Sequence, residues 1–279
     1  MKAAQTVPVL MYHHISPVEG MITTSPSNFE DQLLWLKRRG YRSLSSDEFA
    51  GHLNGIPVPA KSVLITFDDG YLDNWVYAYP LLKKYGFTAL VFLVTSWMHE
   101  GPVRNILGQG ELPETPSHKE CEDRIEQGRS DEVALRWSEI EAMRKDGVME
   151  FHSHTHTHTR WDLIDPSSKN THIVEELDLS RAALQAQLGS VSEHFCWPQG
   201  YFDPDYVRLA QEAGFRYLYT TQAFGQNRAG TDPAHICRFA VRNTSGHSVG
   251  RRIQVAVHPV IGPLFNKWKL WKRSRRNRG

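Results

Sequence analysis

Two short segments of the chain concentrate carboxylate and imidazole side chains. Residues 66–71 read TFDDGY and hold two adjacent carboxylates, and residues 152–158 read HSHTHTH and hold four histidines at alternate positions. Carboxylate oxygens and neutral imidazole nitrogens are common ligands of zinc-like ions. Together the two segments predict a site that activates a water molecule with a metal.

The two carboxylates, Asp68 and Asp69, end an apolar run over residues 63–67 that is typical of a buried parallel strand. Adjacent side chains of an extended chain point to opposite sides. We therefore expect one carboxylate to bind a cation while the other moves protons. Taken alone, Asp-Asp-Gly also fits an ordinary turn at the end of a strand.

The four histidines leave two ligand pairs open. His152 with His156 and His154 with His158 are both four residues apart, a spacing that brings side chains together on a helical turn. On an extended chain all four would share one face. The spacing does not separate these arrangements, and the alternative of an accidental His-rich tract requires the carboxylate pair to be a coincidence.

These segments resemble the first two motifs of the polysaccharide deacetylases, the NodB-homology group also called carbohydrate esterase family 4. In that family the first motif reads T-F-D-D-G, and the second reads H-[ST]-x-x-H after a lead-in of Glu, an apolar residue, Gly and Ser. The resemblance implies that Asp68 is the catalytic base and that Asp69, His154 and His158 hold a divalent metal. Zn²⁺ is the expected ion, with Co²⁺, Ni²⁺ and Mn²⁺ as alternatives. The sequence departs from the lead-in at His152, where the family usually has Gly.

A third family motif, R-x-P-x-G, resembles residues 196–200, CWPQG, in which Cys196 replaces the arginine. The version with an aromatic residue before the proline resembles the motif of the branch that acts on poly-N-acetylglucosamine-type glycans. The resemblance implies that the Gln199 N–H stabilises an oxyanion. It leaves the usual ion pair between the arginine and the base unaccounted for. The residues that we assign to substrate binding are Tyr71, Trp197, Pro198 and Gly200.

The start of the chain supplies a candidate general acid. Residues 7–15 read as a strand that carries His13 and His14 at its C-terminal end. This resembles the Tyr-His start of circularly permuted deacetylases, which implies that His13 is the acid. His14 leaves the opposite face of the strand, so we expect it to pack behind the site. His258 is the alternative acid.

The resemblance implies an enzyme that removes N-acetyl groups from an amino sugar of a polysaccharide or a lipid-linked saccharide. A second hypothesis keeps the metal site but assigns to it the hydrolysis of an O-acetyl ester or of another linear amide. A third hypothesis, from a different class, is a glycan-binding module with a degenerate site. The missing arginine at position 196 favours this third hypothesis, and the intact metal ligands oppose it.

Strand and helix patterns alternate, which predicts an α/β fold with a parallel sheet or barrel. The resemblance, over about residues 7–245, implies a distorted (β/α)7-type barrel, and we expect one catalytic domain over residues 1–260. Capping patterns predict helices that begin at Ser27 and Ser138. Further helices are expected over residues 73–85 and 203–212. Residues 98–136 are predicted as an insertion, a loop with a short helix in preference to a lid.

The C-terminal tail, residues 261–279, differs in charge from the rest of the chain. Residues 266–279 contain seven Lys and Arg and no acid, whereas the remainder holds 25 Lys and Arg against 31 Asp and Glu. Basic residues interleaved with Trp268 and Trp271 indicate peripheral contact with an anionic membrane. A disordered tail is the alternative, and we expect no specific nucleic acid partner.

Three widely spaced cysteines, Cys121, Cys196 and Cys237, predict free thiols instead of a disulfide framework. The chain as given has no signal peptide pattern and no apolar run of about 18 residues. We therefore expect a cytoplasmic protein, in contact with the inner face of the membrane if the tail binds there.

Overall fold

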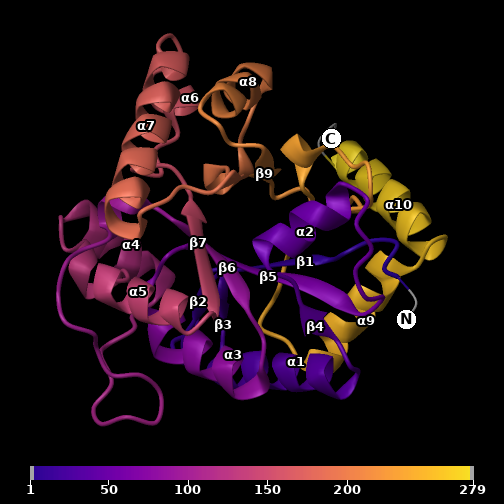
Figure 1. The fold of residues 1–279 in the computed structure, drawn as a ribbon, viewed down its shortest axis with the longest axis horizontal. Coiled ribbons are helices and arrows are strands. Elements are labelled where there is room, and N and C mark those ends of the chain that lie inside the picture. Colours follow the sequence, from indigo (N-terminus) through magenta and orange to yellow (C-terminus); the bar gives the residue numbers. More distant parts are fainter. Residues whose placement is uncertain (1–2, 277–279) are drawn as a thin grey trace.

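A sheet of parallel strands, flanked by helices, forms the body of the protein (Figure 1). The computed structural model describes residues 3–276. The strands follow the order β10-β1-β5-β6-β7-β8-β9, and β4 pairs with β5. The expected α/β fold with a parallel sheet curled like part of a barrel is confirmed.

The strands are β1 (Val9–Tyr12), β2 (His14–Ile15), β3 (Thr23–Thr24), β4 (Arg42–Ser43), β5 (Ser62–Asp69), β6 (Ala89–Leu93), β7 (Met149–Ser153), β8 (His194–Cys196), β9 (Tyr217–Tyr219) and β10 (Phe239–Ala240). The α-helices are α1 (Pro26–Arg38), α2 (Ser46–Leu53), α3 (Tyr79–Tyr85), α4 (His118–Glu126), α5 (Trp137–Lys145), α6 (Trp161–Ile164), α7 (Lys169–Leu188), α8 (Pro204–Glu212), α9 (Gly246–Val257) and α10 (Ile261–Arg276).

The register of the sheet brings the ends of four strands to one level. Tyr12 of β1 is level with Phe67 of β5, so the next residues of the two strands are His13 and Asp68. Asp69 is level with Leu93 of β6, and Leu93 with Ser153 of β7. Because parallel strands place their carboxyl ends at the same edge, the residues that follow these positions meet there.

The two faces of the sheet bury different apolar sets. One face packs Leu10, Ile65 and Val91 under the helices α1, α3, α5 and α9. The opposite, inner face packs Leu64, Phe92 and Tyr219 with α2. All eight residues of β5 are buried, including the two aspartates at its end. The carboxylates therefore end a strand that is buried along its whole length, as the apolar run predicted.

Several helix boundaries differ from the sequence prediction. The first helix is capped by Ser25, whose side chain accepts the N–H of Asn28, and not by Ser27. At the start of α5 the Glu139 carboxylate accepts the backbone N–H of Arg136, and Ser138 is not the cap. In both places several polar residues compete for the cap, and tertiary packing selects one of them. The predicted helix over residues 73–85 begins as a π-helical turn before α3.

The insertion, residues 98–136, contains α4, the short helix that we expected. It is fixed to the body by polar contacts. His118 Nδ1 lies 3.2 Å from His14 Nε2. Arg104 forms a buried ion pair with Glu139 of α5, with 2.8 Å between Nη2 and Oε2. Cys121 is buried against Tyr71. These contacts make the insertion a packed wall beside the end of β5.

The three cysteines are free thiols, as predicted, with Cys121 and Cys196 buried. Among the described residues there is no helix with the length and apolarity needed to cross a membrane. The last helices, α9 and α10, lie together at one side of the molecule (Figure 1).

Two glycines allow α9 to lie close against α1. A β-carbon at Gly246 would lie 2.4 Å from the carbonyl oxygen of Asp31, and one at Gly250 would lie 2.2 Å from ring carbons of Trp35. Gly250→Ala is therefore expected to lower the free energy of unfolding by about 1–3 kcal/mol through overpacking. This occurs even though Ala is the better helix former by about 1 kcal/mol. Urea unfolding measures the change. The exposed Gln254→Ala on the same helix is the control, and a Gly250→Ala protein as stable as the wild type would contradict the close packing.

A buried histidine in the inner face predicts loss of stability in acid. Burial lowers the pKa of His194 to about 3, and its Nδ1 lies 2.9 Å from the hydroxyl of Tyr219. The unfolded chain takes up a proton at this residue near pH 6.5, but the folded protein does not until near pH 3. The free energy of unfolding should therefore fall as the pH drops from about 6.5 towards 3, by at most about 1.4 kcal/mol per pH unit from this residue.

His194→Asn should make this decline shallower, whereas the exposed His247→Asn should leave its slope unchanged. Chemical denaturation at a series of pH values gives both slopes. Equal slopes in the wild type and His194→Asn would show that this histidine does not contribute to acid lability.

Candidate functional site

Three side chains at the carboxyl ends of β5 and β7 form a ligand set around one point. The Asp69 Oδ1 atom lies 3.4 Å from Nε2 of His154 and 3.5 Å from Nε2 of His158. This oxygen is buried and accepts no hydrogen bond within residues 3–276. A buried polar atom without a partner is costly, so the set is suited to an additional atom that none of the three residues supplies.

The chemistry of these three residues fits a divalent metal. The Nδ1–H of His154 can donate to the carbonyl oxygen of Cys196 at 2.8 Å, which leaves its Nε2 free to bind a cation. Burial lowers the pKa of His158 to about 4, so this imidazole is neutral near pH 7. Burial alone would raise the pKa of Asp69. The charges of His154 and His158 outweigh the effect of burial and hold this pKa below its usual range. One carboxylate and two imidazoles are the ligand types of a catalytic metal with an open position.

The segment that carries the two histidines is neither helical nor extended. Thr155 and His158 have left-handed backbones, with φ of 70° and 64°. The buried carboxylate of Glu176, on α7, accepts the N–H groups of His156 and Thr157 at 2.8 and 2.7 Å. Glu176 therefore holds the loop in the shape that turns His158 back towards Asp69.

The structure distinguishes between the two histidine pairs that the spacing left open. His154 and His158 face Asp69, whereas Nδ1 of His156 lies 2.9 Å from Thr95 Oγ1. His152 points into the inner face of the sheet, where its ring lies 5.2 Å from the ring of His194. His152 and His156 are not part of the ligand set.

The second carboxylate, Asp68, is held by a buried arginine that the sequence analysis did not identify. Arg238 donates from Nη1 and Nη2 to the two carboxylate oxygens at 2.6 and 2.8 Å, and it is 1% exposed. Burial raises the pKa of Asp68, but the charge and hydrogen bonds of Arg238 lower it below its usual value. Asp68 is therefore ionised at neutral pH.

Every N–H of the Arg238 guanidinium has a partner. Besides Asp68, the group donates to the carbonyl oxygen of Thr220 at 3.0 Å, to Thr66 Oγ1 at 3.2 Å and to Cys196 Sγ at 2.9 Å. These acceptors use all five donors of an arginine. Arg238 thus joins the ends of β5, β8 and β9 just before β10 begins.

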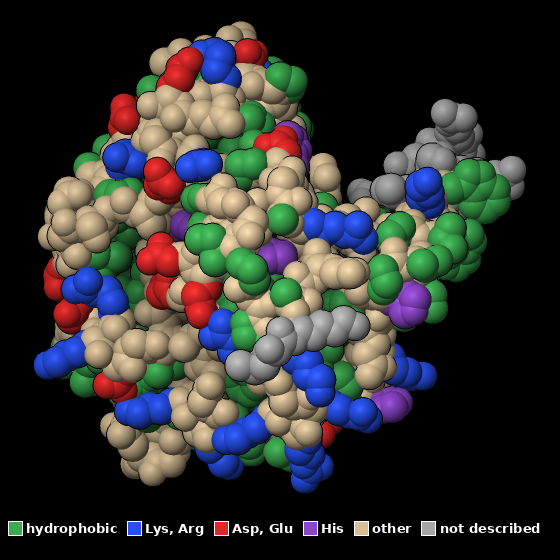
Figure 2. All heavy atoms as spheres, turned by 45° about the vertical axis from the view of Figure 1, so that its right-hand side comes forward, with side chains coloured by type: hydrophobic (Ala, Val, Ile, Leu, Met, Phe, Trp, Pro, Cys, Tyr) green, Lys and Arg blue, Asp and Glu red, His purple; other side chains and the backbone are tan. Residues whose placement is uncertain are grey.

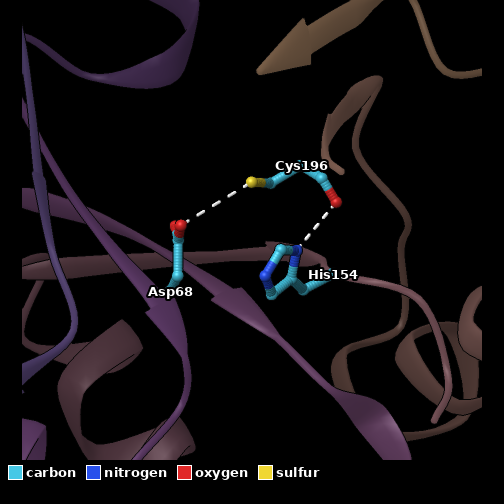
Figure 3. A group of neighbouring side chains, drawn as sticks. All are labelled: Asp68, His154 and Cys196. Atoms are coloured by element: carbon cyan, nitrogen blue, oxygen red, sulfur yellow. Dashed lines mark hydrogen bonds between the residues drawn. The ribbon is translucent and has the colours of Figure 1, made fainter. Parts of the chain in front are cut away.

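Cys196 stands at the sequence position where the family motif has its arginine. Its sulfur lies 3.8 Å from Asp68, and its carbonyl oxygen faces His154 (Figure 3). Asp68, His154 and Cys196 could also surround a cation. However, the Arg238 guanidinium beside Asp68 repels a cation, and burial raises the pKa of the Cys196 thiol, which disfavours the metal-binding thiolate. The Asp69, His154 and His158 set is the better metal site.

The two aspartates do not point to opposite sides, as an extended chain would require. Asp69 has a left-handed backbone with φ of 75°, and both carboxylates lie close to His154. Gly70 follows with φ of 81°, and a β-carbon there would lie 2.7 Å from Leu93. The sharp turn places one carboxylate in the ligand set and keeps the other beside it.

His13 lies at the same site. Its Nε2 is 3.8 Å from Asp68 Oδ2, and its side chain is partly exposed. Burial lowers the pKa of His13, partly offset by the two aspartates. His14 packs behind the site, as expected, with Nδ1 2.6 Å from Asp73 Oδ2. His258 is exposed between α9 and α10, where its Nδ1 accepts the backbone N–H groups of Val260 and Ile261.

Two of the residues that we assigned to substrate binding are buried. Tyr71 and Trp197 are each 1% exposed. Tyr71 stacks on His14 at 3.8 Å between ring centroids beneath the insertion, and Trp197 packs in the apolar cluster around Phe195. Neither ring presents a face to a sugar, so that part of the prediction is wrong. These two aromatic residues, which lie next to the motifs, have a structural role.

The turn at the third motif is tight. Pro198 is buried, and Gln199 and Gly200 have left-handed backbones with φ of 52° and 71°. A β-carbon at Gly200 would lie 2.1 Å from Thr221, so glycine is required there. The side chain of Gln199 accepts a hydrogen bond from Arg160 at 3.0 Å. Its backbone N–H as an oxyanion donor stays a prediction.

Comparison with known proteins places this geometry in a family. The polysaccharide deacetylase family model matches residues 55–218, which is more than half of the chain. A putative polysaccharide deacetylase, YxkH of Bacillus subtilis, is 44% identical over 89 residues, 32% of each chain. A poly-beta-1,6-N-acetyl-D-glucosamine N-deacetylase of Staphylococcus aureus is 27% identical over 211 residues, 72% of this chain and 61% of that protein. The chain thus covers less than two thirds of the length of these curated relatives.

Solved structures share the fold. IcaB from Ammonifex degensii superposes with a TM-score of 0.71 at 24% identity, covering 90% of this chain and 98% of that one. The Streptococcus pyogenes deacetylase PplD, in complex with acetate, also gives 0.71, at 23% identity, covering 90% and 99%. The matched family model, together with the ligand set that it spans, shows that this chain belongs to the polysaccharide deacetylase family.

Proposed function

We propose that this protein uses a divalent metal, Zn²⁺ in the first instance, to hydrolyse the N-acetyl group of an amino sugar in a polysaccharide or lipid-linked saccharide. The observation that carries the proposal is the unpaired, buried Oδ1 of Asp69, 3.4 and 3.5 Å from two imidazole nitrogens. The Staphylococcus aureus relative, which is a deacetylase of poly-N-acetylglucosamine, supports this substrate class.

Asp69, His154 and His158 would hold the metal, which when bound supplies an acidified water and polarises the acetamide carbonyl. Asp68 accepts the proton of the attacking water at its carboxylate. Arg238 keeps this carboxylate ionised and fixes the direction of its oxygens. Because the pKa of Asp68 is held low, the proton can be released again as the reaction proceeds.

His13 would deliver the proton that Asp68 takes from the water to the leaving amine. Its Nε2 lies 3.8 Å from Asp68 Oδ2 and its side chain is partly exposed, so the neutral imidazole can receive that proton and pass it on. The Gln199 N–H, in a turn fixed by Pro198 and Gly200, would donate to the oxygen of the tetrahedral intermediate. Two proton-handling groups and an oxyanion donor complete the set required for amide hydrolysis.

The hypothesis of a degenerate glycan-binding module rested on the arginine missing from position 196. Arg238 now provides an equivalent ion pair with Asp68 from another part of the chain. A binding module has no need for a buried, fully paired guanidinium that orients a carboxylate. This observation supports an enzyme.

Asp68→Asn tests the proposed base. The asparagine keeps the shape but cannot accept the proton, so acetate release should fall by about 10²–10⁴-fold. Metal content, measured by elemental analysis, should stay near that of the wild type, because Asp69, His154 and His158 are intact. His154→Ala should instead lower both metal content and activity.

The assay compares N-acetylated and O-acetylated sugars side by side. Release from the N-acetylated oligosaccharide that is lost in Asp68→Asn supports the proposal. Turnover of the O-acetyl ester alone would assign the enzyme to esters. Full activity in Asp68→Asn, or in wild-type protein stripped of metal, would rule out the mechanism.

Exchange of the arginine tests the role of Arg238. Arg238→Ala leaves Asp68 buried without its partner, which should cost about 3–5 kcal/mol of stability. It should also lower kcat by on the order of 10²-fold through misplacement of the carboxylate. Cys196→Arg combined with Arg238→Ala returns a guanidinium to the family position and should recover part of the activity and stability.

The control for this exchange is Arg104→Ala, which breaks another buried ion pair, with Glu139, away from the metal ligands. It should reduce stability without a comparable loss of kcat, measured below the unfolding temperature. No recovery in the double variant, with kcat unchanged in Arg238→Ala, would show that the ion pair has no catalytic role.

A further inference from the structure

The last helix, α10, carries an exposed apolar stripe. Ile261, Leu264, Trp268 and Trp271 follow one another at intervals of three and four residues, so they lie on one face of the helix. Their side chains are between 49% and 62% exposed. Hydrophobic side chains gather where this helix projects from the body (Figure 2). Such a run of large apolar side chains on one helix face is unusual for a surface that faces only water.

A cationic pocket lies beside this stripe. It has a volume of about 380 Å³ and lies between α9, α10 and the residues around β10. Its lining includes Arg242, Arg252 and Lys269 together with aromatic rings such as Phe239, and it includes no carboxylate. Within residues 3–276 none of these three cations forms an ion pair with Asp or Glu. The pocket therefore presents positive charge that the described part of the protein does not neutralise.

Arg252 shows that this charge is held against apolar surroundings. Its guanidinium stacks on the Phe239 ring at 4.3 Å and donates to the carbonyl oxygen of Ala240 at 2.7 Å. Burial, and the nearby charge of Arg242, lower the pKa of Arg252 to about 10. An anion in the pocket would relieve this unfavourable burial of positive charge.

The rest of the sequence adds to the same charge pattern. Residues 266–279 hold seven Lys and Arg and no acid, whereas the remainder has an excess of six acidic residues. The side chains of residues 272–279 lie outside the described residues, and the inference uses only their charge in the sequence. Basic residues beside an apolar helix face with two tryptophans are typical of helices at the surface of anionic membranes.

We propose that α10 lies on the surface of a membrane that contains anionic phospholipid. The apolar stripe enters the boundary between headgroups and acyl chains, and the pocket lined by Arg242, Arg252 and Lys269 takes a lipid phosphate. Charge complementarity selects this occupant, because a second copy of this face would bring like charges together. Nucleic acid would leave the apolar stripe in water.

Flotation of the full-length protein with vesicles tests the proposal. We expect binding to vesicles of mixed phosphatidylglycerol and phosphatidylcholine, little binding to phosphatidylcholine alone, and release as salt is raised, because salt screens the lipid charge. Leu264→Glu should weaken the partition coefficient by about tenfold or more, since it removes a large apolar side chain from the stripe. Arg252→Gln should weaken it by about fivefold.

Matched variants on other surfaces are the controls. Met21→Glu changes an apolar residue that is 86% exposed, and Arg144→Gln removes an exposed cation of α5. Neither should change the partition coefficient by more than about twofold. Circular dichroism checks that every variant is folded.

Three outcomes would overturn the proposal. The first is equal binding to the two kinds of vesicle, or to neither. The second is unchanged binding of both Leu264→Glu and Arg252→Gln. The third is a dimer in the absence of lipid that Leu264→Glu dissociates in sedimentation, which would assign the stripe to a second copy of the chain.

Discussion

The ion pair between Asp68 and Arg238 is the interaction on which the site depends. A carboxylate buried at the end of β5 would be severely destabilising alone, and the guanidinium offsets this cost with two short hydrogen bonds. The same guanidinium contacts β5, the backbone after β9 and the sulfur of Cys196. It therefore orders the ends of several strands at once. The candidate metal ligands Asp69, His154 and His158 lie beside this ordered edge of the sheet.

The sequence predicted much of the fold because the signals were local, whereas the histidine spacing left two ligand pairs open and only the family resemblance selected His154 and His158. The apolar run before Asp68 and Asp69 specified a buried strand, and parallel register brought His13 and His154 to the same edge. The first helix is capped two residues earlier than predicted because Ser25 accepts the Asn28 N–H, and α5 begins where Glu139 accepts the Arg136 backbone N–H. The left-handed backbone of Asp69 was not predictable from alternation, since it depends on the turn at Gly70.

The residues that were missed act over long sequence distances. Arg238 meets a partner 170 positions earlier, and no short motif surrounds it. The available signal was a single cation in the otherwise apolar stretch of residues 236–241, which predicts a buried charge with a specific partner. Glu176 was hidden in the same way inside a helix. Tyr71 and Trp197 show the reverse error, in which a residue next to a motif supports the backbone and does not touch the ligand.

Because Arg238 lies late in the sequence, its ion pair with Asp68 can form only late in the synthesis of the chain. Asp68, His154 and His158 leave the ribosome long before Arg238, which precedes the edge strand that pairs with β1. Until that edge strand docks, the nascent chain holds an unneutralised carboxylate where its core must form. Pairing of β10 with β1 and formation of the ion pair between Asp68 and Arg238 are therefore linked, because Arg238 directly precedes β10.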